Sequence, residues 1–127
     1  MVEKFGGTAG NIAYSLSLLG ENPVIIATIG KDYDRYADNQ ITGFNPGAMK
    51  YKSEYDFKNP EPKDSAVIIG PGNLQDMKEY AKKAKSKGIK CICDPGQSLT
   101  QWDGNSLREW VDGSYMLITN GKKRYFH

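Results

Sequence analysis

The apolar residues of the chain gather first into short continuous runs, which are typical of strands buried on both faces of a sheet. The runs PVIIATIG and SAVIIG each end at a glycine, and the run IKCIC ends just before Asp94. A last strand is expected in SYMLITN and a weaker one in QITGF. The pattern therefore predicts strands at residues 23–30, 65–70, 89–94, 114–120 and 40–44.

Between these runs, apolar residues recur at the three- and four-residue spacing of an amphipathic helix. Ile12, Leu16 and Leu19 predict a helix over residues 10–19, with Gly20 as its C-terminal cap. The segment NSLREWV predicts a short helix before the last strand. The polar residues 50–63, with their aromatic side chains and prolines, indicate a surface connection.

A further helix is predicted from Leu74 to about Lys87. Asn73 can cap its N-terminus, and Gly88 can close its C-terminus. Its apolar stripe consists of Leu74, Met77, Ala81 and Ala84, joined by Tyr80.

The alternation of strands and helices predicts a mostly parallel sheet with helices on its faces, in one domain over residues 1–127. No Asn-Gly hairpin signal separates two of the strands. In parallel sheets ligands bind beyond the C-terminal ends of the strands. Gly30, Gly70, Asp94 and Asn120 all fall at those ends, so we expect the working edge of the sheet there.

Composition excludes several classes of function. Apolar content of 39% and charged content of 25% are ordinary for a globular protein, and the net charge of +2 favours no particular partner. The basic run KKR at residues 122–124 indicates a solvated tail rather than a nucleic-acid site. The chain has no apolar run long enough for a membrane span and no secretory signal, so we expect a cytoplasmic protein without nucleic-acid or membrane partners.

The two cysteines, Cys91 and Cys93, lie on the same face of a predicted strand. Two thiols cannot complete a four-ligand metal site, and the one histidine is the terminal residue. We expect both to be small buried hydrophobic residues in a reducing compartment, and we expect no bound metal.

The glycine-rich stretch FGGTAGN raises several alternatives. Its spacing departs from the G-x-G-x-x-G dinucleotide motif, and no Lys-Ser or Lys-Thr follows as a phosphate loop requires. Adjacent glycines could instead let a polyol approach the backbone, with the Asn11 amide bonding its hydroxyls. The remaining alternative is that the glycines only permit close packing of the helix on a sheet.

The longer pattern resembles the first signature of the ribokinase-like (PfkB) family of carbohydrate and nucleoside kinases. That signature has a Gly-Gly pair, then a small residue and an Asn, and glycines after the next helix and strand. Further resemblances lie in GKDY, NQITGFNPGAM, CDPGQSL and LITN. The matching positions of the signature here are Gly6, Gly7, Ala9, Asn11, Ala13, Gly20 and Gly30.

The resemblance implies a partial Rossmann-like three-layer α/β/α sandwich and ATP-dependent phosphorylation of a sugar or nucleoside hydroxyl. By position, Gly6, Gly7 and Asn11 would contact the hydroxyls of the substrate. Asn45, Asp94 and Asn120 are candidates for the edge of that site. Asp94 has an alternative role as a turn residue before Pro95 that bonds local backbone amides.

The chain also departs from the family pattern. Only Asp34–Ala37 separates the G-x-D loop from the NQIT segment, where the family carries most of its lid. Lys123 stands where the N-x-x-E motif has its Glu, and a cation there would repel Mg²⁺. The G-A-G-D segment with the catalytic Asp, and the ATP-binding half, have no counterpart. We therefore expect no catalytic residue, and neither of the family's cofactors, ATP and Mg²⁺, in this chain.

Three functions fit these observations. In the first, the chain is a truncated, lidless relative of a sugar or nucleoside kinase and is inactive alone. In the second, it is a module that binds a sugar or nucleoside, or that self-associates through an exposed sheet edge. In the third, it is an engineered minimal α/β domain without a ligand. The sequence does not name the sugar or nucleoside.

Overall fold

The computed structural model describes residues 8–27, 50–58 and 61–119. The chain divides into two compact units, Met1–Tyr55 and Asp56–His127, which we describe separately. The predicted strand at residues 40–44 and the loop NPGAM lie outside the described residues. The prediction of one domain over residues 1–127 stays a prediction.

The first unit contains helix α1, Thr8–Leu18, close to the predicted range 10–19. Gly20 has φ +87°, and its N–H donates to the Ser17 carbonyl oxygen at 3.1 Å. A left-handed residue with this bond is a standard helix end, because it satisfies a carbonyl that the helix leaves free. The predicted C-terminal cap is therefore confirmed.

The predicted strand at residues 23–30 is wrong over the part that the structure describes. Residues 21–27 form no strand. The side chains of Val24 and Ile25 are 78% and 54% exposed. A strand exists only through hydrogen bonds to a neighbouring strand, and no described residue of this unit supplies one.

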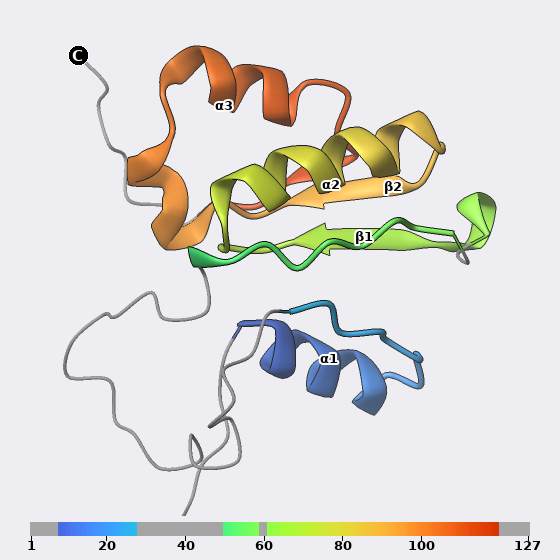
Figure 1. The fold of residues 1–127 in the computed structure, drawn as a ribbon. Helices are drawn as coiled ribbons and strands as arrows, with labels where there is room; N and C mark the ends of the chain where they lie inside the picture. The colour runs from blue at the N-terminus through green and yellow to red at the C-terminus, as the bar shows by residue number, and fades with distance from the viewer. Residues whose placement is uncertain (1–7, 28–49, 59–60, 120–127) are drawn as a thin grey trace, which may run out of the picture. The chain divides into compact units, whose positions relative to one another are not determined.

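The second unit contains a parallel sheet of three strands: β1, Ala66–Ile69; β2, Lys90–Cys93; and β3, Met116–Leu117. Their order in the sheet follows the sequence, with Ile69 opposite Cys93 and Cys93 opposite Leu117. Helices α2, Leu74–Ser86, and α3, Gly104–Val111, connect the strands. Both helices lie on one face of the sheet, α2 directly on β1 and β2 (Figure 1). The predicted parallel α/β class is confirmed.

Helix α2 follows its sequence signals closely. The Asn73 side-chain oxygen accepts hydrogen bonds from the N–H groups of Gln75 and Asp76 at 3.0 and 3.2 Å. Gly88 takes φ +71° after the helix. Both predicted ends of this helix are therefore confirmed. The buried face carries most of the predicted stripe: Met77, Ala81 and Ala84.

Helix α3 begins at an N-cap that the sequence pattern did not single out. The Asp103 carboxylate accepts from the N–H groups of Asn105 and Ser106 at 3.1 and 2.9 Å, and from the Ser106 hydroxyl at 2.6 Å. Ahead of it, Gly96–Gln101 forms a 3₁₀ helix that was also not predicted. The hydrogen bonds that the Asp103 carboxylate accepts satisfy backbone N–H groups that the first turn of α3 leaves free.

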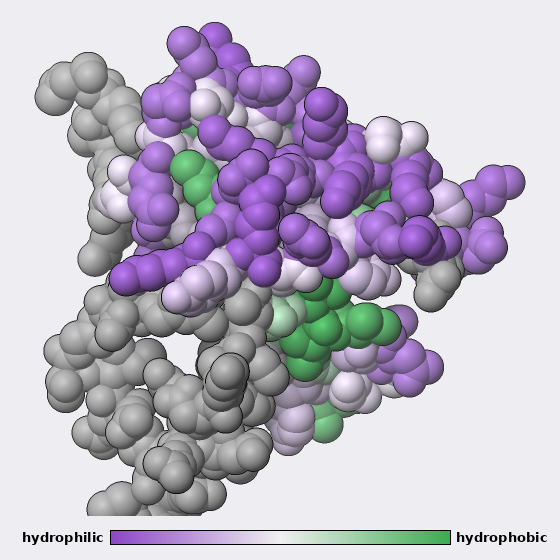
Figure 2. All heavy atoms as spheres, in the orientation of Figure 1, coloured by the Kyte–Doolittle hydropathy of each residue, from purple (hydrophilic) through white to green (hydrophobic). Residues whose placement is uncertain are grey.

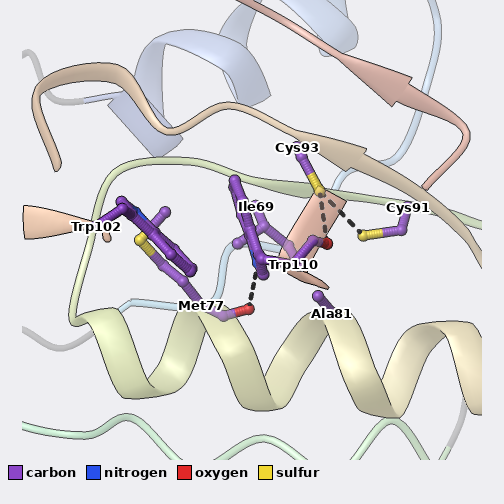
Figure 3. Close-up of a cluster of buried hydrophobic side chains, with 7 residues drawn as sticks. All are labelled: Ile69, Met77, Ala81, Cys91, Cys93, Trp102 and Trp110. Atoms are coloured by element: carbon purple, nitrogen blue, oxygen red, sulfur yellow. Dashed lines mark hydrogen bonds between the residues drawn. The ribbon is translucent and has the colours of Figure 1, made fainter. Parts of the chain in front are cut away.

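The core lies between the sheet and its two helices (Figure 3). Trp110 on α3 donates its indole N–H to the Met77 carbonyl oxygen on α2 at 2.8 Å. The visible outer face of residues 61–119 is mostly polar, whereas apolar side chains gather on residues 8–27 (Figure 2). No helix in the described part of the chain is long and apolar enough to cross a membrane. The buried cluster consists of Ile69, Met77, Ala81, Cys91, Cys93, Trp102 and Trp110.

Candidate functional site

The three parallel strands end side by side, and backbone hydrogen bonds continue between the segments just beyond their C-terminal ends. The Asp94 N–H donates to the Ile69 carbonyl oxygen at 2.9 Å, and the Ile118 N–H donates to the Cys93 carbonyl oxygen at 2.8 Å. The segments that follow β1, β2 and β3 therefore start at one edge. This is the edge at which parallel sheets bind ligands.

A hollow of about 250 Å³ lies at this edge, beyond β2 and β3. Its walls combine apolar side chains with one carboxylate and one hydroxyl. Thr119 supplies the hydroxyl and Asp94 the carboxylate. The lining residues are Asp94, Pro95, Gly96, Leu99, Ile118 and Thr119.

Among the predicted site residues that the structure describes, Asp94 lines this hollow. Its Oδ1 accepts a hydrogen bond from the Gly96 N–H at 3.1 Å. The turn role that the sequence offered as an alternative is therefore real. It leaves the second carboxylate oxygen of this half-buried residue to interact with a hydroxyl donor.

The wall of the hollow depends on a close contact between Gly96 and Pro71. Gly96 has φ +43°, and a Cβ atom placed on it would lie 2.3 Å from the Pro71 side chain. The next turn is fixed by Ser98, which is fully buried and donates its hydroxyl to the Gly72 carbonyl oxygen at 3.5 Å. Only glycine fits this contact, because any side chain would overlap the proline.

The remaining predicted site residues are less informative. Asn11 lies on α1 with an exposed side chain, and its carbonyl oxygen accepts from the Ser15 hydroxyl at 3.0 Å. A Cβ atom on Gly10 would meet nothing within 4 Å, so the described residues show no close packing at that glycine. The others, Gly6, Gly7, Asn45 and Asn120, lie outside the described residues.

Sequence reasoning missed most of the lining of the hollow. Leu99 was not singled out, although it lies only a few residues beyond Asp94 in CDPGQSL. Ile118 and Thr119 were assigned to a strand, whereas β3 ends at Leu117 and the two residues face the hollow. The signal that could have found them is their position at the end of a strand, which was used only for Gly30, Gly70, Asp94 and Asn120.

The described residues contain no group of three His, Cys, Asp or Glu side chains that could hold a metal ion. Cys91 and Cys93 are both buried with free thiols, as the sequence predicted. The hollow itself offers one carboxylate, whereas Mg²⁺ is usually bound by one or two carboxylates together with phosphate oxygens and waters. The described site therefore does not fit a protein-held Mg²⁺ by itself.

Comparison with known proteins relates the chain to nucleoside kinases. A nucleoside kinase of Methanocaldococcus jannaschii is 27% identical over 149 residues, covering 91% of this chain and 48% of the relative. The structure of Burkholderia thailandensis nucleoside kinase, in complex with inosine, matches with a TM-score of 0.73 and 31% identity. That match covers 90% of this chain and 49% of the other. No protein-family model matches the sequence.

These matches confirm the predicted resemblance to ribokinase-like kinases and the α/β fold that it implied. The chain is a relative of nucleoside kinases and spans about half the length of those it matches. The alignment with the archaeal relative, at 149 residues, is longer than this chain of 127 residues. That relative therefore carries residues without a counterpart here.

Proposed function

We propose that this chain is the nucleoside-binding part of a nucleoside kinase fold and that it transfers no phosphate on its own. The observation that carries the proposal is the match, over 90% of the chain, to a nucleoside kinase solved with inosine. Both relatives bear the name nucleoside kinase, which favours a nucleoside over a simple sugar as the ligand.

The hollow at the sheet edge supports this proposal chemically. Pro95, Leu99 and Ile118 offer apolar surface to a base or a ribose ring, and the free oxygen of Asp94 offers an acceptor to a ribose hydroxyl. At about 250 Å³, the hollow is smaller than the roughly 300–1,000 Å³ of pockets that enclose a drug-sized ligand. We therefore propose that it takes only part of a nucleoside.

Further contacts are proposed from the resemblance. Gly6, Gly7 and Asn11 would contact substrate hydroxyls, because adjacent glycines expose backbone and an amide both donates and accepts. The same resemblance also proposes Asn45, Asp94 and Asn120, each separately, as substrate contacts. Asp94 and Asn11 each have their own variant in the test below, so neither of these two assignments depends on the other.

Phosphoryl transfer needs a positioned nucleotide, stabilisation of the phosphoryl charge and a base for the hydroxyl. The sequence lacks the G-A-G-D segment that carries that base in the family, and Lys123 replaces the Glu of the N-x-x-E motif. We therefore assign no residue of this chain to ATP, Mg²⁺ or catalysis. In the proposal its residues bind and orient the nucleoside.

Calorimetric titration of the purified chain with inosine and adenosine tests the proposal. We expect saturable binding, weakened in Asp94→Asn, which keeps the acceptor for Gly96 but removes the charge. Asp64→Asn is the matched control on an exposed carboxylate outside the hollow. Asn11→Ala is compared in the same way with Asn22→Ala, at an exposed Asn beyond α1.

The same preparation is assayed for inosine phosphorylation with ATP and Mg²⁺, where we expect no turnover above background. Robust turnover would refute the claim that the chain is inactive alone. Absence of any nucleoside binding, together with a cooperative melt that ligands do not shift, would favour a minimal α/β domain without a ligand.

A second candidate function is self-association through the sheet edge. The observation that suggests it is that β3 pairs only with β2 among the described strands, so one edge of β3 is open. The side chains around it are 44–64% exposed and apolar or aromatic: Tyr115, Met116, Leu117 and Ile118. Light scattering during size exclusion tests this candidate, and a monomer at all concentrations would remove it.

A further inference from the structure

The two cysteines form a close pair that the proposed nucleoside site does not use. Cys91 and Cys93 lie two residues apart on β2, so their side chains point to the same face. Their sulfur atoms are 3.8 Å apart, and both side chains are at most 1% exposed (Figure 3). They lie within the core cluster, under α3, and the Cys93 sulfur is 4.0 Å from the Trp110 carbonyl oxygen.

The surroundings give the two thiols different protonation. A hydrogen bond from Cys91, reinforced by the Ser114 side chain and the Lys85 ammonium, lowers the pKa of Cys93 from 9.0 to about 7. The same hydrogen bond, together with burial, raises the pKa of Cys91. Cys93 is therefore the thiol of the pair that ionises first as the pH rises, and Cys91 is the protonated partner. A low-pKa thiol beside a second thiol can be oxidised to a disulfide once the pair is accessible to the oxidant.

We propose that Cys91 and Cys93 are a peroxide-sensitive dithiol that closes to a reversible disulfide within β2. The Cys93 thiolate attacks one oxygen of hydrogen peroxide, the O–O bond breaks, and hydroxide leaves to form Cys93 sulfenic acid. Hydroxide takes the Cys91 proton and becomes water. The Cys91 sulfur then attacks the Cys93 sulfur, the S–O bond breaks, and hydroxide leaves and becomes a second water with the proton that Cys93 had released to the solvent. Two thiols and one peroxide give one disulfide and two waters.

Closing the disulfide would disturb the sheet, because β2 is its central strand. Residues two apart on a strand have Cα atoms about 6.6 Å apart and side chains that point the same way, so their Cβ atoms lie farther apart than the roughly 4.5 Å that a disulfide allows. The two sulfurs must also approach from 3.8 Å to about 2 Å, which requires β2 to bend. The oxidised form is therefore less stable than the reduced form and is readily reduced by a dithiol.

Access to the buried pair requires local opening of the elements that cover it. Helix α3 is only eight residues long, and its C-terminal carbonyl groups are held by Lys85, which donates to Trp110 and Asp112 at 2.6 Å each. Opening of this helix uncovers Cys93 without unfolding the sheet. The rate of oxidation therefore rises in urea at concentrations that leave the chain folded.

The test treats the full reduced chain with hydrogen peroxide and follows its intact mass. We expect the loss of two hydrogens per monomer, a disulfide between Cys91 and Cys93 in the peptide map, a lower melting temperature, and full recovery with dithiothreitol. Two thiols that still alkylate fully after peroxide treatment would overturn the proposal. Gain of oxygen without a disulfide, or a disulfide between two monomers, would overturn it as well.

Single variants assign the roles of the two sulfurs. At pH 7, Cys91→Ser keeps a hydroxyl donor beside Cys93 and should form a sulfenic acid that dimedone traps. We expect it to react about fivefold faster than Cys93→Ser, because its larger thiolate fraction outweighs the lower nucleophilicity of a more acidic thiol. Equal rates, or a faster Cys93→Ser, would refute the assignment. Circular dichroism checks the fold of both variants, and the wild-type mass measurement decides the disulfide even where a variant does not fold.

Discussion

Trp110 on α3 is tied to Met77 on α2 by a buried hydrogen bond, 2.8 Å from the indole nitrogen to the carbonyl oxygen. Trp102 lies beside it, with ring centroids 4.7 Å apart. The indole N–H of Trp102 is also buried, yet within the described part of the chain it has no hydrogen-bond partner. The same core thus contains two neighbouring indole rings, one whose N–H group has a hydrogen-bond partner and one whose N–H group has none among the described residues.

This difference predicts opposite contributions from the two indole N–H groups. Trp110→Phe removes a buried hydrogen bond, whereas Trp102→Phe removes a buried donor that has no partner. We expect Trp110→Phe to lower the free energy of unfolding by about 1 kcal/mol more than Trp102→Phe. Urea unfolding of both variants measures the difference. Equal losses would contradict the prediction.

The contact of Gly96 with Pro71 predicts a strong effect of one methyl group. Gly96→Ala places a Cβ against the proline at a positive φ, so we expect a loss of about 1–3 kcal/mol in stability. We also expect weaker nucleoside binding, because Gly96 lines the hollow. Gly104→Ala is the matched control, since a Cβ there meets nothing within 4 Å and alanine favours a helix. Thermal melts measure the change in stability of the two variants, and calorimetric titration measures their change in nucleoside binding.

The N-cap of α3 predicts a dependence of stability on acid. Hydrogen bonds from the Ser106 hydroxyl and from backbone N–H groups lower the pKa of Asp103 below its ordinary value of 3.8. A carboxyl group whose pKa is lower in the folded state stabilises the fold above its unfolded pKa. That contribution disappears as the pH falls through the folded pKa.

Asp103→Asn keeps the capping oxygen but does not titrate. We expect the wild type to lose more melting temperature than Asp103→Asn when the pH falls from about 6 to about 3. Thermal melts by circular dichroism over this range measure the difference between the two proteins. If the melting temperatures of the two proteins fell in parallel with pH, the Asp103 carboxylate would not contribute to the acid dependence of stability.

The elements that the sequence predicted well carry their own signals. Asn73 and Gly88 mark the ends of α2, and the spacing of Met77 and Ala81 marks its buried face. These signals act within a few residues, so they do not depend on the rest of the fold. The segment around Val24 had equally apolar residues but no described strand beside it, and a strand depends on that neighbour.

The candidate site was predicted only in part for a related reason. Asp94 was placed at the sheet edge, because its position after a strand is visible in the sequence. The hollow beside it arises where the segments after β2 and β3 meet, which brings Leu99 near Ile118. Gly96 and Pro71 are likewise distant in sequence and in contact in the fold. Such contacts arise when segments distant in sequence pack together, so a local sequence pattern does not predict them.

Lys85 predicts a further measurable link between α2 and α3. Its ammonium group donates to the carbonyl oxygens of Trp110 and Asp112 at 2.6 Å each. A cation at the C-terminal end of a helix satisfies carbonyls that have no partner within the helix. Lys85→Met keeps most of the side-chain volume and removes both bonds, so we expect a loss of about 1–2 kcal/mol. Lys82→Met, at an exposed lysine of the same helix, should change stability little. Urea unfolding of the pair tests the link, and an equal change in both variants would show that the two bonds do not hold α3 in place.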